Sequence, residues 1–401
     1  MSIILEKAFE LSKYKLLSKE ILYKRFLFYD LKKSKAKIRG IYGARGVGKT
    51  TLLIQLLRSM KYSPKEAIYI SCDHPVFSDL NLFEFLEDFS KIGGKIVFID
   101  EIHKIPDFQK HLKSAYDFLD LKIIFSGSSS ISLNDPDMTR RFSMYKLPIL
   151  SFREYLELKY GFSIKSLSLE EIISDHEDIE IKILKTIKPE KILKLFYEYL
   201  DSGAYPFFLE DSDKYHERLN ETINATLYYD LAEIYKINIE KISTLKKLLI
   251  TICVSKPLEL SIEKMAKRVN VSKTTLYKYI GYLEKGEIIK HMSHEARRFK
   301  NIRKPDKLYL SNTNLLKALC LEGDIGTLRE TFFSSAVGYN HTLNYSTKGD
   351  FIVDEKMIFE VGGKNKDFSK GKGLSNYYLA LDNIETGIGN KIPLWLFGFL
   401  Y

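Results

Sequence analysis

The stretch Gly43-Ala44-Arg45-Gly46-Val47-Gly48-Lys49-Thr50 lies between an apolar, strand-like run at Lys37–Tyr42 and a helix-like run at Thr51–Met60. It fits the pattern G-x-x-x-x-G-K-[ST], in which glycines let backbone N–H groups turn toward phosphate oxygens at the positive end of a helix. A match in isolation is weak, but a strand before it and a helix after it are the context that the pattern needs. The sequence therefore predicts an α/β fold with a parallel sheet and a nucleotide-binding loop.

Within this loop, Lys49 is expected to reach the outer phosphates and Thr50 to hold Mg²⁺, so that ATP and Mg²⁺ are the expected cofactors. The residues expected to contact the nucleotide are Gly43, Arg45, Gly46, Val47, Gly48, Lys49, Thr50 and Thr51.

An acidic pair ends a strongly apolar run, Lys95-Ile96-Val97-Phe98-Ile99-Asp100-Glu101, whose distance from the loop suits one intervening strand and helix. Asp100 is expected to steer the metal together with Thr50, and Glu101 to orient or deprotonate the attacking water. The plainer interpretation is that the pair only ends a core strand and opens a helix. Its spacing from the glycine-rich loop favours the catalytic interpretation.

Two further segments could complete such a site. The run Leu121–Phe125 ends in Ser126-Gly127-Ser128-Ser129, where Ser128 or a neighbour could sense the terminal phosphate at the carboxyl edge of the sheet. In isolation this segment is only a turn. Arg140 and Arg141 follow, and either could act as an arginine finger on the nucleotide of a neighbouring subunit, or simply form a solvated basic pair.

These motifs resemble those of the prokaryotic AAA-type ATPases that carry a fused carboxyl-terminal domain related to the restriction-endonuclease fold. The resemblance spans nearly the whole chain. Its specific parts are GARGVGKT (43–50), FIDEIHKIPDF (98–108), the serine sensor and RRFSMYKLPILSFREYL (140–156), and its softer parts are SGAYP (202–206) and FEVGGK (359–364). The family usually has Gly-Gly-Tyr-Pro where this chain has Gly203-Ala204-Tyr205-Pro206.

The resemblance implies four domains. They are an ATPase core (1–150), a helical lid (151–240), a winged helix-turn-helix (241–312) and a small α/β nuclease-like domain (313–401).

Composition and cysteine usage fit a folded cytoplasmic protein. The chain has 401 residues, enough for about two to four domains. The three cysteines are scattered, which argues against a disulfide framework or a zinc site. The amino terminus meets a charge too early for a signal peptide, and no apolar run is long enough to span a membrane.

Positive charge is concentrated in one segment. The chain has 62 Lys and Arg, of which 17 lie between Lys241 and Leu310 and 45 lie elsewhere. It has 52 Asp and Glu, of which 6 lie in this segment and 46 elsewhere. This segment therefore carries the whole surplus, as expected of a nucleic-acid-binding surface.

The same segment has a helix-turn-helix pattern. Apolar residues fall at helical spacing in 262–269 and again in 276–283, and Ser272 is placed to cap the second helix. The outward positions expected to meet a DNA major groove are Lys273, Thr274, Thr275, Tyr277 and Lys278.

Two strand-like runs, 288–290 and 307–310, flank a basic connection that would form a wing. Its residues expected to contact phosphates are Arg297, Arg298, Lys300 and Arg303. A winged helix that docks a protein, with its charge merely solvated, is the alternative.

The carboxyl-terminal region looks like a nuclease of the PD-(D/E)xK type, in which such acids bind Mg²⁺. Glu330, Asp350 and Glu360 match its acids by order, but Gly362 occupies the expected lysine position and Lys364 lies two residues further along. A migrated lysine in an active nuclease is one interpretation. We expect instead a degenerate site without nuclease activity, with Asp350 and Glu360 in a vestigial or purely structural hairpin.

The leading hypothesis is an ATPase whose nucleotide state controls how the winged helix and the nuclease-like module engage duplex DNA, with assembly into a homo-oligomer through an arginine finger. The alternative is a nucleotide-gated signalling switch or scaffold that turns over little ATP and docks a protein partner. A toxin-antitoxin or phage-defence nuclease ranks third.

Overall fold

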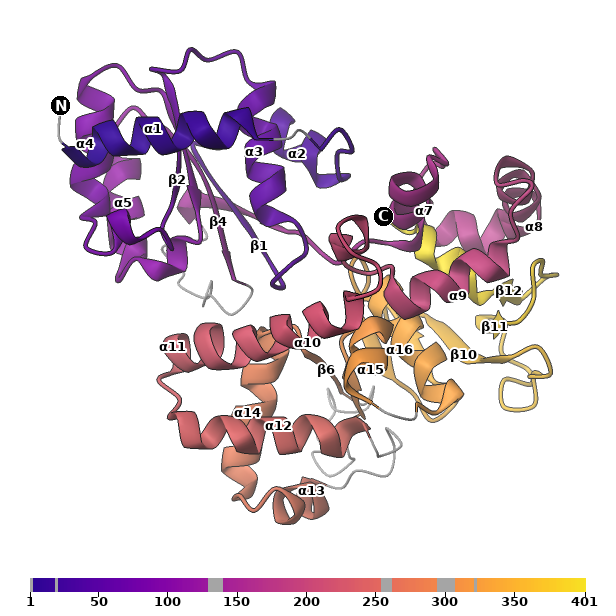
Figure 1. Ribbon diagram of the computed structural model, residues 1–401. Coiled ribbons are helices and arrows are strands. Elements are labelled where there is room, and N and C mark those ends of the chain that lie inside the picture. Colours follow the sequence, from indigo (N-terminus) through magenta and orange to yellow (C-terminus); the bar gives the residue numbers. More distant parts are fainter. Residues whose placement is uncertain (1–2, 19–20, 129–139, 254–261, 294–306, 321–322) are drawn as a thin grey trace. The chain divides into compact units, whose positions relative to one another are not determined.

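The computed structural model describes residues 3–18, 21–128, 140–253, 262–293, 307–320 and 323–401 (Figure 1). The chain divides into two compact units, which we call the amino-terminal unit (Met1–Pro148) and the carboxyl-terminal unit (Ile149–Tyr401). Among the described residues, no helix combines the length and the apolar character that crossing a membrane requires.

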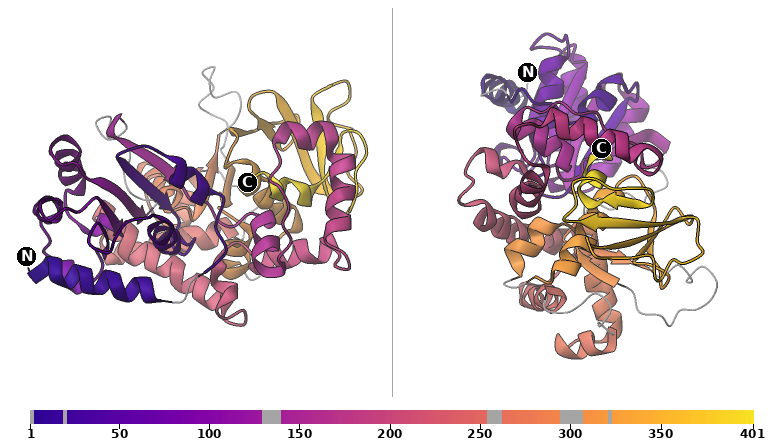
Figure 2. Two further views of the ribbon diagram at one scale, coloured as in Figure 1. Left: turned by 90° about the horizontal axis from the view of Figure 1, so that it is seen from above. Right: turned by 90° about the vertical axis from the view of Figure 1, so that its right-hand side faces the viewer.

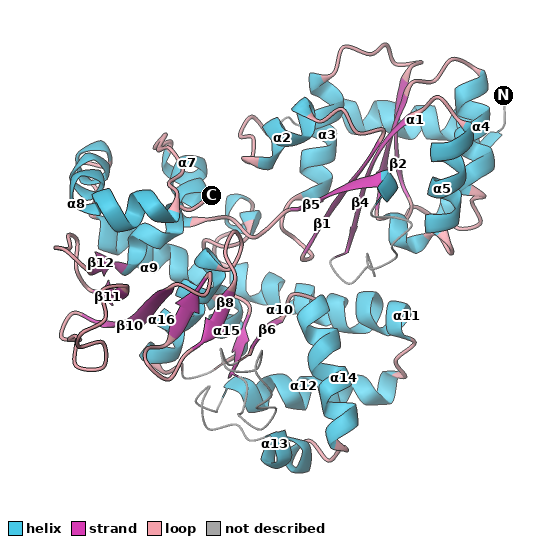
Figure 3. Ribbon diagram, turned by 180° about the vertical axis from the view of Figure 1, so that it is seen from behind, coloured by secondary structure: helices cyan, strands magenta, loops and turns pink. Residues whose placement is uncertain are grey.

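The amino-terminal unit is built on a five-stranded, all-parallel sheet in the order β2-β3-β4-β1-β5. Figure 3 shows these strands as magenta arrows between cyan helices. Its elements are α1 (Ile3–Leu17), α2 (Leu27–Lys33), β1 (Ile38–Gly43), α3 (Lys49–Ser59), β2 (Ala67–Ser71), η1 (Pro75–Phe77), α4 (Leu82–Lys91), β3 (Ile96–Asp100), η2 (Ile102–Lys104), α5 (Phe108–Phe118), β4 (Lys122–Ser128) and β5 (Phe142–Lys146). The predicted parallel sheet is confirmed.

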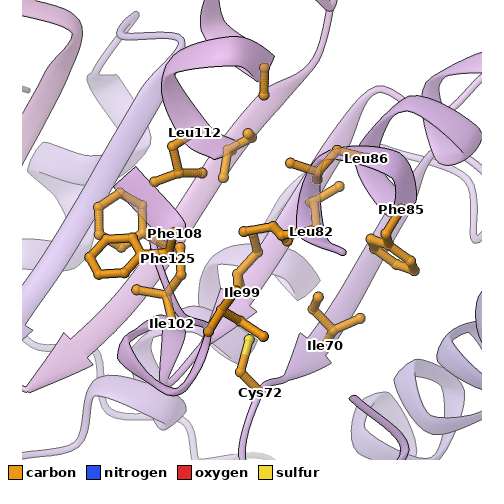
Figure 4. Close-up of a cluster of buried hydrophobic side chains, with 14 of the residues drawn as sticks. Ile70, Cys72, Leu82, Phe85, Leu86, Ile99, Ile102, Phe108, Leu112 and Phe125 are labelled. Carbon is orange, nitrogen blue, oxygen red and sulfur yellow. The ribbon is translucent and has the colours of Figure 1, made fainter. Parts of the chain in front are cut away.

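The strands are apolar along their length because helices cover both faces of the sheet. All five residues of β3 are buried. On one face, Ile99 and Phe125 from the sheet pack with Leu86 of α4 and Leu112 of α5 (Figure 4). Each side chain of this kind contributes about 1.5–3 kcal/mol when it is fully buried. This core fixes the carboxyl ends of β3 and β4, where the polar side chains of the candidate site begin.

The carboxyl-terminal unit begins with helices. They are α7 (Phe152–Tyr160), α8 (Leu169–Thr186), α9 (Ile192–Ser202), η3 (Pro206–Leu209), α10 (Tyr215–Ala225), the π-helical η4 (Thr226–Leu231), α11 (Ala232–Tyr235), α12 (Ile239–Cys253), α13 (Ile262–Arg268) and α14 (Lys273–Lys285). Capping boxes start α7 at Ser151 and α8 at Ser168, each with a glutamate three residues on. Such caps satisfy N–H groups that a helix leaves unpaired at its start.

Strands and two further helices complete this unit. They are β6 (Ile289–Met292), β7 (Lys307–Leu310), α15 (Thr313–Leu319), α16 (Ile325–Val337), β8 (Leu343–Tyr345), β9 (Phe351–Val353), β10 (Met357–Gly363), β11 (Tyr377–Asp382), β12 (Lys391–Pro393) and the 3₁₀-helical η6 (Leu394–Phe399). A mixed sheet has the order β12-β11-β10-β9-β8, with β10, β11 and β12 parallel and β8 and β9 antiparallel.

The first helices of this unit and its last residues share one core. Phe152 of α7 packs edge-on against Phe399 of η6, and Phe196 of α9 packs against Phe332 of α16. The Ser151 hydroxyl donates a 2.8 Å hydrogen bond to the carbonyl of Tyr401. In Figures 1 and 2 the magenta helices α7–α9 accordingly lie beside the yellow end of the chain.

The segment with the helix-turn-helix pattern contains two helices and a pair of strands at the predicted positions. The two predicted helices are α13 and α14, and the Ser272 side chain caps α14 by accepting the Thr275 N–H. The two predicted strands are β6 and β7, which pair antiparallel.

The cysteine prediction was wrong for two of the three residues. Cys253 at the end of α12 and Cys320 just after α15 form a disulfide across a sequence separation of 67, while Cys72 is a free, buried thiol. Scattered positions in sequence do not exclude a bridge, because packing of α12 against α15 brings the two chain positions together.

Candidate nucleotide site

Two glycines of the loop 43–50 are required by its geometry. A Cβ atom on Gly43 would lie 2.2 Å from the carbonyl oxygen of Leu147, so any side chain there would displace the backbone. Gly48 has φ of 100°, in the left-handed region that other residues adopt only with strain. The loop can therefore turn tightly from β1 into α3, whose amino-terminal N–H groups lie at its end.

Lys49 begins α3 and is buried, with its ammonium group held inside the loop. Its Nζ donates 2.9 Å hydrogen bonds to the carbonyls of Gly43 and Ala44. From outside the loop, the buried Arg25 donates to the carbonyl of Val47 at 3.1 Å and to that of Pro148 at 3.0 Å. The loop is thus braced from both sides by cations that satisfy its carbonyls.

Three hydroxyl groups converge on the carboxylate of Asp100 at the end of β3. Thr50 donates a 2.6 Å hydrogen bond to Oδ2, and Tyr69 of β2 donates to the same oxygen at 2.8 Å. Ser126 of β4 donates to Oδ1. The two residues predicted as metal ligands, Thr50 and Asp100, therefore touch, and both present oxygen atoms of the kind that Mg²⁺ prefers.

Tyr69 and Ser126 are positioning residues that the sequence reasoning did not single out. Tyr69 lies on the strand next to β3, so its reach to Asp100 depends on the pairing of β2 with β3. Burial and the adjacent charge of Asp100 raise the pKa of Tyr69 far above its usual range, so it remains a proton donor to that carboxylate.

Glu101 has an unusual backbone conformation. Its φ of 52° lies in the left-handed region, which costs a non-glycine residue of order 1–3 kcal/mol and concentrates at functional sites. Its N–H donates to the hydroxyl of Ser126 at 3.2 Å. Oε2 of Glu101 lies 3.4 Å from Nδ1 of His103 in η2.

His103 is a third residue that the sequence reasoning missed. Its side chain is 3% exposed, and its Nδ1 also accepts the Ser128 N–H at 3.4 Å. Burial and the positive charges of Lys104, Lys49 and Arg45 lower the pKa of His103 to about 3. The imidazole is therefore neutral near pH 7, and its contact with Glu101 is not an ion pair.

The remaining predicted residues of this site are the serines at the end of β4 and the two candidates for the arginine finger. Ser128 is buried at the end of β4, next to His103, whereas Ser129 lies outside the described residues. Arg141 contacts Asp117 of α5 at 3.3 Å, so this finger candidate is engaged within its own unit, and Arg140 is exposed beside it.

A cavity of about 620 Å³ opens beside these groups. Thr50, Asp100 and Glu101 line one part of it, and Tyr14 and Lys15 of α1 line another. The three residues expected to handle metal and water are thus reachable from one space.

Comparison with known proteins identifies the domain that carries this site. Residues 35–156 match the family described as an AAA domain. They form an AAA-type P-loop ATPase domain. Residues 193–326 match a family described only as a domain of unknown function, DUF8612.

The chain is similar to an uncharacterized protein of Methanocaldococcus jannaschii, which is 29% identical over 80% of this chain and 74% of the relative. Among solved structures, a Walker-type ATPase of Pyrococcus abyssi is 16% identical with a TM-score of 0.43, over 75% of this chain and 96% of its own. A signal transduction ATPase with a tetratricopeptide repeat sensor from Pyrococcus horikoshii is 14% identical with a TM-score of 0.30, over 80% of this chain and 45% of its own.

Outside the AAA domain, the predicted DNA-contacting side chains of α14 face outward. Lys273, Thr274, Tyr277 and Lys278 are exposed and Thr275 is half-buried. Lys273 forms an ion pair with Glu263 of α13. The predicted wing residues Arg297, Arg298, Lys300 and Arg303 lie outside the described residues.

The three acids predicted for the carboxyl-terminal module lie near one another. Burial and the charges of Glu330 and Glu360 raise the pKa of Asp350 to about 6. Each acid also has partners of its own: Lys307 lies 3.3 Å from Glu330, Val361 N–H donates to Asp350, and Tyr377 donates to Glu360. In the part of the chain that the structure describes, no three acidic, histidine or cysteine side chains are arranged to hold a metal ion.

The lysines that reach Glu360 are not the one expected from the sequence. Lys366 lies 2.6 Å and Lys370 2.9 Å from its Oε1. The Lys366 N–H donates to the carbonyl of Gly363 at 3.0 Å, so the chain turns after β10 and brings Lys366 beside the acid.

Proposed function

We propose that the AAA domain binds Mg-ATP and hydrolyses it. The observation that carries this proposal is the 2.6 Å contact between Thr50, at the start of the phosphate loop's helix, and Asp100, at the end of β3. Two segments 50 residues apart in sequence thereby offer a hydroxyl and a carboxylate to one cation. Mg²⁺ keeps several waters and substrate phosphates as ligands, so two protein oxygens suffice.

The roles of the chain's own residues follow from their positions. Lys49 exchanges its bonds with the loop carbonyls for bonds with the outer phosphates, and the loop's N–H groups bind the remaining phosphate oxygens. Glu101 orients and deprotonates water in the adjoining cavity, and Ser128 senses the terminal phosphate. When bound, Mg²⁺ neutralises charge on the phosphates.

The proposal extends to DNA. α12–α14 with β6 and β7 would form a winged helix whose exposed α14 residues contact duplex DNA, in a manner controlled by the nucleotide state. Support comes from the charge of the segment 241–310 and from the exposure of Lys278 and Tyr277. Arg140 or Arg141 would act on a neighbouring copy's nucleotide, which makes turnover depend on assembly.

A nucleotide-gated scaffold that docks a protein is the second candidate. One observation favours it: Lys273 is already paired with Glu263, which removes a cation from the expected DNA-facing set, while the aromatic ring of Tyr277 is exposed. Exposed aromatic rings are enriched at protein interfaces.

The test is the steady-state rate of ATP hydrolysis with and without duplex DNA, with Lys49→Ala as the blank. Stimulation by DNA supports the leading proposal, whereas hydrolysis that is absent or indifferent to DNA supports the scaffold. Duplex binding should fall with salt at a log-log slope of about −0.9 per neutralised phosphate. Lys278→Ala should weaken it, and Lys317→Ala, an exposed lysine of α15 outside the basic segment, should not.

For the carboxyl-terminal module we propose a degenerate nuclease-like site without activity. The separate partners of Glu330, Asp350 and Glu360 support this view, because each carboxylate is already engaged. Incubation of supercoiled DNA with Mg²⁺ or Mn²⁺ tests it. Nicking that disappears in Asp350→Ala would revive an active nuclease.

A further inference from the structure

His103 lies between the residue proposed to activate water and the residue proposed to sense the terminal phosphate. Glu101 is the proposed base and lies on the segment after β3, whereas Ser128 is the proposed phosphate sensor at the end of β4. One atom, Nδ1 of His103, lies 3.4 Å from Oε2 of Glu101 and 3.4 Å from the backbone N of Ser128. The imidazole is the group that touches both.

These two contacts cannot both be hydrogen bonds at one time. To accept the Ser128 N–H, Nδ1 must carry a lone pair, whereas to bond the carboxylate of Glu101 it must carry a proton. Since the ring is neutral, it has a single proton to distribute between Nδ1 and Nε2. The choice between Ser128 and Glu101 is therefore a choice of tautomer.

Nε2, the other ring nitrogen of His103, keeps the free energies of the two tautomers similar. Nε2 is buried and has no hydrogen-bond partner among the described residues. A proton on Nε2 would be a buried donor without an acceptor, which opposes the tautomer that accepts from Ser128. The Ser128 N–H opposes the other tautomer, because a protonated Nδ1 cannot accept from it. Neither partner is held at the short distance of a strong bond.

We propose that His103 is a positioning residue that couples the phosphate-sensing end of β4 to the orientation of Glu101, by exchanging its Nδ1 between Ser128 and Glu101. Displacement of Ser128 releases Nδ1. Nε2 then gives its proton to solvent, Nδ1 takes one from solvent, and the new Nδ1–H donates to Oε2 of Glu101. Glu101, whose Oε2 lies 3.4 Å from this ring, also has a backbone φ of 52° in the left-handed region. The inference rests on the proposed ATP hydrolysis.

The experiment compares kcat and KM for ATP in wild type, His103→Leu and His103→Asn. Loss of a residue that orients a catalytic group typically costs about 10–100-fold in activity. His103→Leu should therefore lower kcat at least about tenfold with KM changed less than about twofold. His103→Asn, which keeps a polar atom near the position of Nδ1, should recover most of that loss.

A double-variant comparison separates coupling from a structural role. In the Glu101→Gln background, His103→Leu should cost less than about twofold more in kcat, because residues that act through one another are not additive. The inference would be overturned if the kcat losses of the two single variants multiplied in the double variant. It would also be overturned if kcat were unchanged in His103→Leu. If wild type itself fails to hydrolyse ATP, the proposed function fails first.

The chain offers a matched control for burial and hydrogen bonding. His111 of α5 also accepts a backbone N–H at Nδ1, from Phe83 of α4 at 3.3 Å, so its described hydrogen bond joins two helices and not the groups of the candidate site. His111→Leu should leave kcat unchanged. Thermal melting of all variants reports whether any loss follows from unfolding, in which case His103→Asn alone decides the outcome.

Discussion

The hydroxyl of Tyr69 donates a 2.8 Å hydrogen bond to Oδ2 of Asp100, the same oxygen that accepts from Thr50. A carboxylate held by hydroxyls from two sides keeps one orientation, which is what a metal ligand needs. We expect Tyr69→Phe to raise the Mg²⁺ concentration for half-maximal ATP hydrolysis about tenfold. KM for ATP at saturating Mg²⁺ should not change.

The measurement is the rate of ATP hydrolysis over a Mg²⁺ titration at fixed ATP. Tyr14→Phe provides the control, because Tyr14 lines the same cavity from α1. An unchanged Mg²⁺ requirement in Tyr69→Phe would assign Tyr69 to packing alone.

Substitutions in the phosphate loop and at Glu101 should affect different steps, nucleotide binding and hydrolysis respectively. Lys49→Ala is expected to abolish nucleotide binding, because no other ammonium group reaches the interior of the loop among the described contacts. Glu101→Gln should keep binding and slow hydrolysis by about 10²–10⁴-fold, the usual contribution of a general base. Binding of a fluorescent ATP analogue and single-turnover hydrolysis measure the two effects. Comparable turnover in Glu101→Gln and wild type would remove Glu101 from the base role.

The disulfide should stabilise the carboxyl-terminal unit. A bridge across 67 residues removes freedom from the unfolded chain worth about 4 kcal/mol in the chain-entropy account, and measured values are typically about 2–4 kcal/mol. Cys253→Ser with Cys320→Ser should lower the free energy of unfolding by that amount and remove its dependence on reductant. Without reductant, denatured protein should show the single thiol of Cys72. Three reactive thiols there would contradict the bridge.

His176 should make stability depend on pH. Its ring contacts Glu180 at 2.7 Å and the carbonyl of Gly389 at 2.8 Å. Burial acts to lower the pKa of His176, but the hydrogen bonds to Glu180 and Gly389 and the charges of Glu180 and Glu177 outweigh it, so the pKa is raised. The protonated ring then holds α8 to the turn before β12. This stabilisation is complete below the unfolded pKa of about 6.5 and is lost as pH rises through the folded value.

Thermal melting of wild type and His176→Gln between pH 5.5 and 9 checks this prediction. The difference between them should be largest at the acid end, at about 2 kcal/mol for a hydrogen-bonded charge, and should shrink with rising pH. His216→Gln, at an exposed histidine, is the control. A difference that grows with pH would contradict the assignment.

The parallel sheet and the positions of Lys49, Thr50 and Asp100 could be predicted because they depend on local order along the chain. A strand, a glycine-rich loop and a helix fix one another, and an acid at the end of β3, after one intervening strand, meets them at the carboxyl edge of the parallel sheet. Tyr69 could not be predicted in this way, because its contact with Asp100 depends on the lateral register of β2 against β3.

Contacts between segments that are far apart along the chain could not be predicted from the sequence either. Ser151 bonds the carbonyl of Tyr401, and Cys253 bonds Cys320, without any periodic signal that links the two positions of either pair. His103 did have a signal, since it is a polar residue between Ile102 and Ile105 just after the acidic pair. Its second partner, Ser128, arrives from another strand and becomes visible only in the folded unit.

One side chain, Arg25, holds the carbonyls of both Val47 and Pro148. Val47 belongs to the phosphate loop, and Pro148 is the point at which the chain leaves the amino-terminal unit. A displacement of the chain at that exit would therefore reach the phosphate loop through the Arg25 guanidinium, in addition to the 2.7 Å hydrogen bond from the Leu147 N–H to the carbonyl of Tyr42 just before the loop. Removal of the Arg25 side chain would weaken this link between residue 148 and the phosphate loop without breaking it, because the Leu147 bond remains.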